Sequence, residues 1–181
     1  MLGYYKDEKA TAEVITDGWF HTGDIGFLDS EGFLIITDRK KDIIVTSGGK
    51  NVSPQNIENS LKQSRFISQA VVLGDQHHYL VALIVPNYDS VSKTLGLDQK
   101  SKFDLSQNLK VEELIRKEID EFTLDFASYE KIKYFRLLPD ELTQERGEMT
   151  PTLKIKRKVI NEKYADFIGS MYAEGEKRKE S

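Results

Sequence analysis

Residues 70–85, AVVLGDQHHYLVALIV, decide the fold, because they place two continuous apolar runs around one polar connection. The runs Ala70–Leu73 and Leu80–Val85 are short and rich in β-branched residues, which favours central strands covered on both faces. His77 and His78 fall in the connection, and we interpret them as exposed turn residues. The stretch therefore predicts two buried strands at the centre of a small sheet.

Helical patterns lie on both sides of these strands. Ser53 followed by Pro54 is typical of a helix start, with Ser as N-cap and Pro at the first helical position. Val111, Ile115 and Ile119 are spaced four residues apart, which predicts a long helix with one face toward a core. The run 134–138, YFRLL, predicts a further strand.

The C-terminal region predicts a last helix and a polar tail. The helix is expected to begin near Arg157 and to turn these residues inward: Val159, Ile160, Tyr164, Phe167, Ile168 and Met171. Residues 173–181 are polar, and we expect them to be frayed. Residues 41–172 are therefore predicted to form one α+β domain, a small central β-sheet covered by helices.

Residues 1–40 read differently from this domain. Residues 26–28 and 33–37 flank the turn sequence DSEG, which predicts a β-hairpin. Residues 1–24 contain no long periodic apolar stripe, so they look unable to bury a core of their own. We expect the chain to begin partway through a larger protein and its orphaned strand edges to pair with another copy, as an edge-strand dimer.

Composition excludes several classes of function. The chain has 181 residues, with 26 basic against 30 acidic side chains, a balance that does not suggest a nucleic-acid partner. There is no cysteine and there are three histidines, which argues against disulfides, thiolate chemistry and a histidine-rich metal site. No apolar run approaches the roughly 18–20 residues of a transmembrane segment. We expect a cytoplasmic protein, with peripheral membrane association left open for the full-length form.

Three segments could carry chemistry, and each has a plain structural alternative. Asp24 ends a Thr-Gly-Asp turn, and its carboxylate could accept hydrogen bonds from a vicinal diol such as a ribose, although turns also use these residues for structure. The glycine-rich run 47–50, SGGK, lacks the spacing of a phosphate-binding Walker loop. Lys154 opens a cationic run to Lys158 that could meet a phosphate or an oxyanion, or could simply flank a surface helix.

Taken in order, these segments resemble the C-terminal end of the adenylate-forming, acyl-activating enzymes. The matching runs are 3–6 (GYYK), 17–26 (DGWFHTGDIG), 38–44 (DRKKDII), 47–54 (SGGKNVSP) with Ile57 and Glu58, and 150–154 (TPTLK). Residues 149–157, MTPTLKIKR, resemble the long-chain fatty acyl-CoA ligase branch. Many relatives carry Gly where this chain has Leu153, a departure that the long-chain branch tolerates.

The resemblance implies a fold and a division of the chain. Residues 1–40 would end the large N-terminal adenylation domain, of which the hairpin is a remnant, and residues 41–172 would form the mobile C-terminal cap domain. The missing N-terminal domain would be the main partner. The fragment alone is expected to be inactive.

The resemblance also implies a reaction and its residues. A fatty acid and ATP would form an acyl-adenylate, from which coenzyme A would take the acyl group; Mg²⁺ is expected with ATP, although no ligand cluster for it is evident. The implied roles are ribose binding for Asp24 and Arg39, the hinge for Lys41, the pantetheine loop for Gly48 and Gly49, a phosphate contact for Lys50, and catalysis of adenylation for Lys154.

Two alternatives stay open at this point. One is an adenylation domain of another acyl-activating type, such as a peptide synthetase or a luciferase-like enzyme. The other is a non-catalytic module that binds a polyanion or a protein through Lys154, Lys156, Arg157 and Lys158.

Overall fold

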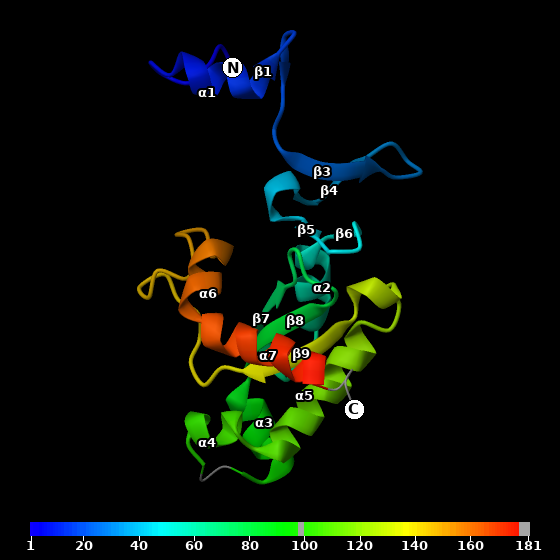
Figure 1. The fold of residues 1–181 in the computed structure, drawn as a ribbon, viewed down its shortest axis with the longest axis vertical. Helices are drawn as coiled ribbons and strands as arrows, with labels where there is room; N and C mark the ends of the chain where they lie inside the picture. The colour runs from blue at the N-terminus through cyan, green and yellow to red at the C-terminus, as the bar shows by residue number, and fades with distance from the viewer. Residues whose placement is uncertain (98–99, 178–181) are drawn as a thin grey trace. The chain divides into compact units, whose positions relative to one another are not determined.

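The computed structural model describes residues 1–97 and 100–177, and the chain divides into two compact units, Met1–Ile43 and Ile44–Ser181 (Figure 1). The first unit contains α1 (Glu8–Val14), β1 (Ile15–Thr16), β2 (Trp19–Phe20), β3 (Asp24–Leu28), β4 (Leu34–Arg39) and the 3₁₀ turn η1 (Lys40–Asp42). The second unit contains β5 (Ile44–Val45), β6 (Asn51–Val52), α2 (Pro54–Leu61), β7 (Ile67–Leu73), β8 (Leu80–Pro86), α3 (Tyr88–Leu95), α4 (Lys102–Ser106), α5 (Leu109–Phe122), η2 (Ser128–Glu130), β9 (Ile132–Leu137), α6 (Arg157–Lys163) and α7 (Ala165–Lys177). No helix of the described ranges is long and apolar enough to cross a membrane.

The first unit is built around the predicted hairpin. β3 and β4 pair antiparallel, and Asp29 Oδ1 closes the turn by accepting hydrogen bonds from the amides of Glu31 and Phe33, both at 2.9 Å. Within residues 1–43, all of which are described, Asp38 alone is buried. The unit therefore has no hydrophobic core of its own, as expected, and its apolar side chains, such as Phe27 and Leu34, are exposed. The edge-strand dimer stays a prediction.

A three-stranded sheet forms the centre of the second unit. Its order is β7-β8-β9, with β7 antiparallel and β9 parallel to β8. All seven residues of the middle strand β8 are buried, which confirms the prediction of a strand covered on both faces. The parallel connection from β8 to β9 passes through α3, α4 and α5, two of which (α3 and α4) no sequence pattern predicted.

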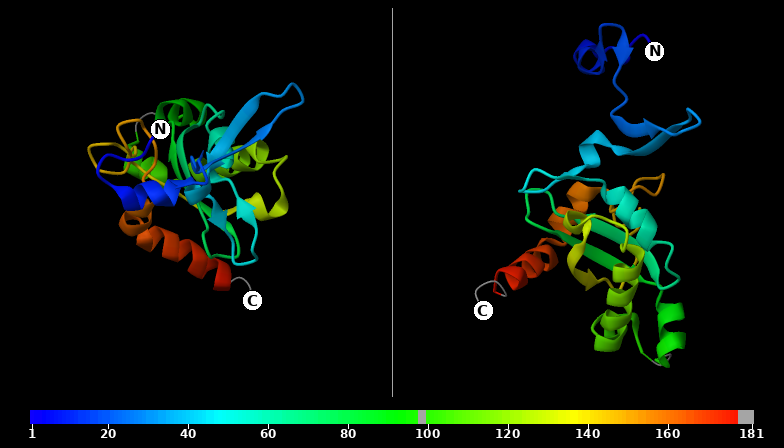
Figure 2. Two further views of the ribbon diagram at one scale, coloured as in Figure 1. Left: turned by 90° about the horizontal axis from the view of Figure 1, so that it is seen from above. Right: turned by 90° about the vertical axis from the view of Figure 1, so that its right-hand side faces the viewer.

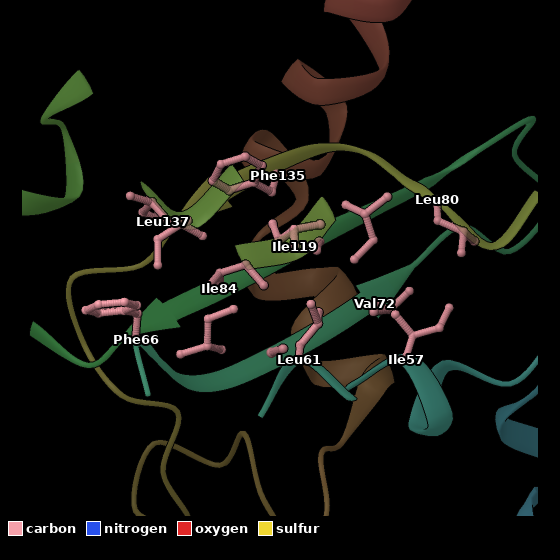
Figure 3. Close-up of a cluster of buried hydrophobic side chains, with 14 of the residues drawn as sticks. Ile57, Leu61, Phe66, Val72, Leu80, Ile84, Ile119, Phe135 and Leu137 are labelled. Atoms are coloured by element: carbon pink, nitrogen blue, oxygen red, sulfur yellow. The ribbon is translucent and has the colours of Figure 1, made fainter. Parts of the chain in front are cut away.

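Helices cover both faces of this sheet (Figure 2). One face packs Val72 and Ile84 against α2 and α5, and Figure 3 shows Ile57, Leu61 and Ile119 of these helices in that cluster. The opposite face packs other strand residues against α6 and α7, through side chains that include Ile160 and Met171. The predicted α+β class, a small sheet covered by helices, is therefore confirmed.

A bulge in β9 changes which face of the sheet its side chains point to. Leu80 pairs with Ile132, but Val81 pairs with Tyr134, so Lys133 is an extra residue. Ile132 and Tyr134 consequently lie on opposite faces despite being two residues apart, Ile132 in the α2/α5 layer and Tyr134 in the α6/α7 layer.

The C-terminal helix differs from its prediction in three respects. It is two helices, because Tyr164 between α6 and α7 leaves helical geometry and hydrogen-bonds the buried Glu148. Phe167, expected inside, is 41% exposed. Helix α7 continues to Lys177, past the predicted domain end at residue 172, because Gly175 is buried against Tyr79 and Tyr134. The remaining part of the predicted frayed tail, residues 178–181, lies outside the described residues.

Candidate functional site

Asp24 and Arg39 form a cross-strand pair at the open end of the β3–β4 hairpin. They are fifteen residues apart in sequence but are register partners, and Arg39 Nε lies 2.6 Å from Asp24 Oδ1. Both side chains remain accessible, Asp24 at 26% and Arg39 at 44% exposure. A carboxylate beside a guanidinium offers acceptors and donors on one surface, which suits a vicinal diol.

Lys41 follows this pair in the short turn η1. It is exposed and lies two residues before the boundary between the two units, which falls after Ile43. The turn is held to the hairpin by the Lys40 amide, which donates to the Gly23 carbonyl at 2.7 Å.

Gly48, Gly49 and Lys50 lie in a tight turn between β5 and β6, here called the glycine turn (Thr46–Lys50). The Thr46 amide donates to the Lys50 carbonyl at 3.0 Å, and the Lys50 amide donates to Thr46 Oγ1 at 3.1 Å. Gly49 has a φ of +72°, a left-handed conformation that favours glycine. Residues 47–50 of the turn are exposed and carry no side chain at two successive positions, so a ligand can approach the backbone closely.

The connection between β7 and β8 supports the glycine turn from one side. Ser47 Oγ lies 2.6 Å from His78 Nδ1, and the Ser47 amide donates to the His77 carbonyl at 3.0 Å. Asp75 Oδ1 accepts from the Val45 amide at 3.0 Å. The two histidines are exposed turn residues, as predicted, but sequence reasoning missed that His78 contacts the glycine turn.

His77 has a second role, in docking the last helix. Its ring stacks on the ring of Tyr172 with centroids 3.6 Å apart. Although His77 is exposed, partial desolvation of its ring lowers the pKa of His77, and the nearby Asp75 carboxylate offsets part of that effect. Nothing in the sequence pattern pairs a turn histidine with a tyrosine 95 positions later, so this contact could not have been predicted.

Lys154 lies near the tip of a small β-hairpin, here called the lysine hairpin (Glu148–Lys156). Its two arms are joined by hydrogen bonds from the Lys156 amide to the Glu148 carbonyl and from the Thr150 amide to the Lys154 carbonyl, both at 2.8 Å. Between them Met149 and Ile155 form a β-bridge. Lys154 therefore lies on a paired element with an exposed tip.

Leu153, immediately before the lysine, occupies the left-handed region with a φ of +59°. A leucine rarely adopts this conformation, because its Cβ crowds the following carbonyl. Its side chain is 71% exposed and gains little from packing. Glycine, which has no Cβ, would adopt the same conformation without this strain.

A buried ion pair holds Arg157, the residue that follows the lysine hairpin. Arg157 Nη2 lies 2.7 Å from Glu58 Oε1, and Arg157 Nη1 donates to the Val72 carbonyl at 2.8 Å. Glu58 also accepts from the Val72 amide at 2.8 Å. Burial raises the pKa of Glu58, and the charge of Arg157 offsets part of the rise. The guanidinium of Arg157 is therefore engaged by groups of the interior. The predicted cationic surface loses one of its members, which weakens the polyanion-binding alternative.

The structure groups the predicted site residues by unit. Asp24, Arg39 and Lys41 belong to the first unit, with the first two in direct contact. The glycine turn and the lysine hairpin belong to the second unit, on separate connections. Within residues 1–97 and 100–177, no group of three or more His, Asp or Glu residues could hold a metal ion.

The chain is similar to proteins of known sequence and structure. Residues 41–176 match the family model of the AMP-binding enzyme C-terminal domain. Long-chain-fatty-acid–CoA ligase FadD15 of Mycobacterium tuberculosis is 44% identical over 177 residues, which cover 94% of this chain and 29% of that protein. Long chain acyl-CoA synthetase 7, peroxisomal, of Arabidopsis thaliana is 36% identical, over 95% of this chain and 26% of that protein. The chain thus spans less than a third of the length of these curated relatives.

Solved structures share the fold. The A-PCP didomain of carboxylic acid reductase from Segniliparus rugosus, in complex with AMP, superposes with a TM-score of 0.80 at 25% identity. That match covers 95% of this chain and 23% of the other. A Mycobacterium tuberculosis fatty acyl CoA synthetase gives a TM-score of 0.52 at 28% identity, over 91% of this chain and 28% of the other.

Proposed function

Because this chain belongs to the family of AMP-binding enzyme C-terminal domains, we propose that it is the C-terminal part of a long-chain fatty acid–CoA ligase. The observation that carries the proposal is the similarity to FadD15, which extends over 94% of this chain. In this reaction a fatty carboxylate oxygen attacks the α-phosphate of ATP and expels pyrophosphate. The thiol of coenzyme A then attacks the acyl carbon and expels AMP.

The Asp24–Arg39 pair is proposed to hold the ribose of the nucleotide. The carboxylate accepts hydrogen bonds from both ribose hydroxyls, and the guanidinium donates to a neighbouring oxygen. The 2.6 Å contact between the two side chains supports this role, since each orients the other at the accessible end of the hairpin.

Lys154 is proposed to neutralise the negative charge that develops on the carboxylate and α-phosphate oxygens during adenylation. An ammonium on a flexible four-carbon side chain can follow that charge. The paired backbone that carries this side chain limits the cost of positioning the ammonium. The paired arms of the lysine hairpin support this role.

The glycine turn is proposed to lie along the pantetheine arm of coenzyme A in the second half-reaction, with Lys50 at a phosphate. Lys41 is proposed as the hinge about which residues 41–172 turn between the two half-reactions, while residues 1–40 stay with the N-terminal domain. ATP and coenzyme A are the ligands of the whole enzyme. Mg²⁺ is proposed to accompany ATP in the whole enzyme. Cytoplasmic localisation stays a prediction of the sequence.

The test uses the full-length protein that carries this chain. We expect ATP–pyrophosphate exchange that depends on a long-chain fatty acid, and Lys154→Ala to abolish it while thioester formation from supplied acyl-adenylate is largely spared. Lys93→Ala, which removes another exposed lysine in α3, is the matched control and is expected to leave both rates unchanged. Equal loss of both half-reactions in Lys154→Ala would contradict the assignment, and exchange driven by amino acids instead of fatty acids would favour a peptide synthetase.

A further inference from the structure

Glu148 is a completely buried carboxylate that has no part in the proposed reaction. Its Oε1 accepts hydrogen bonds from Lys163 Nζ at 2.6 Å and from the Tyr164 hydroxyl at 2.7 Å. Its Oε2 accepts from the Thr143 amide at 3.0 Å. Arg146 Nε lies 3.7 Å from Oε1 and adds a further positive charge.

A carboxylate taken out of water is costly unless its oxygens are fully hydrogen-bonded. Glu148 meets this condition with partners from three places: the preceding loop, the end of α6 and the residue that joins α6 to α7. Burial would raise the pKa of Glu148, but the hydrogen bonds from Lys163 and Tyr164 outweigh it and hold the pKa below its ordinary value. The side chain is therefore a charged, immobile anchor.

The anchor sits at the base of the lysine hairpin. The Glu148 carbonyl accepts from the Lys156 amide, the next pair along is the Met149–Ile155 bridge, and the pair beyond it is Thr150 with Lys154. The Lys154 amide also donates to Thr150 Oγ1 at 3.1 Å. Two steps of paired backbone thus connect the buried carboxylate to the backbone of the lysine.

We propose that Glu148 is a positioning residue that sets where Lys154 presents its ammonium, an inference that rests on the adenylation role proposed for Lys154. Replacing the carboxylate by an amide removes the charge and turns an NH₂ group toward one or two of three donors. The base of the hairpin then loosens, and the ammonium at its tip is displaced from the developing charge. A displacement of about 1 Å is enough to cost about 100-fold in rate.

The experiment measures the two half-reactions separately in the full-length enzyme. We expect Glu148→Gln to slow adenylation about 10- to 100-fold and to leave thioester formation from supplied acyl-adenylate within about 2-fold. Tyr164→Phe, which keeps the carboxylate and removes one donor, should show a smaller loss of the same selectivity. Because both changes act through one contact, the double variant should be no slower than Glu148→Gln alone.

Two controls separate positioning from general loss of stability. Val91→Ala creates a cavity in the core beneath α3 and should lower stability without changing the ratio of the two rates. Hydrogen exchange should quicken at the amides of Lys154 and Lys156 in Glu148→Gln and keep its normal rate there in Val91→Ala. Unchanged exchange in Glu148→Gln would overturn the proposal without reference to activity.

The outcomes also separate this inference from the proposed function. If exchange does not depend on a long-chain fatty acid, the proposed function fails, and if Lys154→Ala leaves adenylation intact, the role proposed for Lys154 fails and the inference with it. If Lys154→Ala abolishes adenylation but Glu148→Gln slows both half-reactions equally, or neither, only the positioning role is wrong. If Glu148→Gln does not fold, Tyr164→Phe and Lys163→Met decide by the same ratio, because both keep the buried carboxylate.

Discussion

Leu153 allows a direct test of the geometry of the lysine hairpin, through a comparison of Leu153→Gly with Leu153→Ala. Both variants remove the leucine atoms beyond the Cβ, which are largely exposed, so the lost burial of these atoms cancels between them. They differ in the Cβ, which costs about 1–2 kcal/mol in the left-handed region. Glycine has more conformational freedom in the unfolded chain than alanine. This lowers the stability of the glycine variant by about 0.5–1 kcal/mol and offsets part of its advantage.

The net expectation is that Leu153→Gly is more stable than Leu153→Ala by about 0.5–1 kcal/mol. The matched control compares Glu162→Gly with Glu162→Ala. Glu162 is an exposed residue inside α6, and helical geometry makes the Gly variant less stable than the Ala variant by about 1 kcal/mol. The two positions should therefore give opposite signs.

The assay is urea unfolding of the 181-residue chain, with the midpoints compared at a constant slope. For a slope near 2 kcal/mol per molar, the expected midpoint of Leu153→Gly lies about 0.3 M above that of Leu153→Ala. If Gly proves less stable than Ala at position 153, as it should be at Glu162, the left-handed conformation of Leu153 and the explanation built on it are wrong.

Gly175→Ala should destabilise the docking of α7 by about 1–3 kcal/mol, because the new Cβ would overlap the Tyr79 hydroxyl. Thermal unfolding measures this loss of stability, and an unchanged midpoint would contradict the packing. The pKa of Glu148 is lowered on folding, since its hydrogen bonds outweigh burial, so its contribution is present above the unfolded pKa of about 4.3 and is lost as the pH falls through the folded value. Glu148→Gln should therefore cost about 2 kcal/mol at neutral pH and show a shallower acid transition than the parent in unfolding at pH 3–7. The pKa of His77 is lowered on folding by burial, so the stack on Tyr172 is stable above a pH of about 6.5 and weakens as the pH falls through the folded pKa; an imidazole NMR titration with a midpoint at or above about 6.5 would refute this.

The elements that sequence alone predicted are those whose signal is local. The apolar runs of β7 and β8 demanded burial on both faces, and the four-residue spacing in α5 required a single buried face. Ser53 before Pro54 marked the start of α2, and Asp29 marked the turn of the hairpin, where each side chain caps backbone amides a few residues away. Helices α3 and α4 escaped prediction because they are short and present few apolar residues to the core.

The candidate site was identified by motif, and its geometry was not. Asp24 and Arg39 each stand in a recognisable segment, but their contact depends on the register of two strands, which a one-residue slip would destroy. The support given to the glycine turn by His78 is likewise a contact between residues 31 positions apart.

By itself, the sequence determined the class of fold, the family and the identity of the residues that could act, because periodicity, capping and short motifs are written in neighbouring residues. Only the tertiary structure decided which charges serve the surface and which serve the interior. Lys154 and Arg157 belong to one cationic run, yet the lysine stays exposed while the arginine is drawn to Glu58. The physical reason is that a buried carboxylate must be paired, and its partner is chosen by packing between segments that lie far apart in the chain.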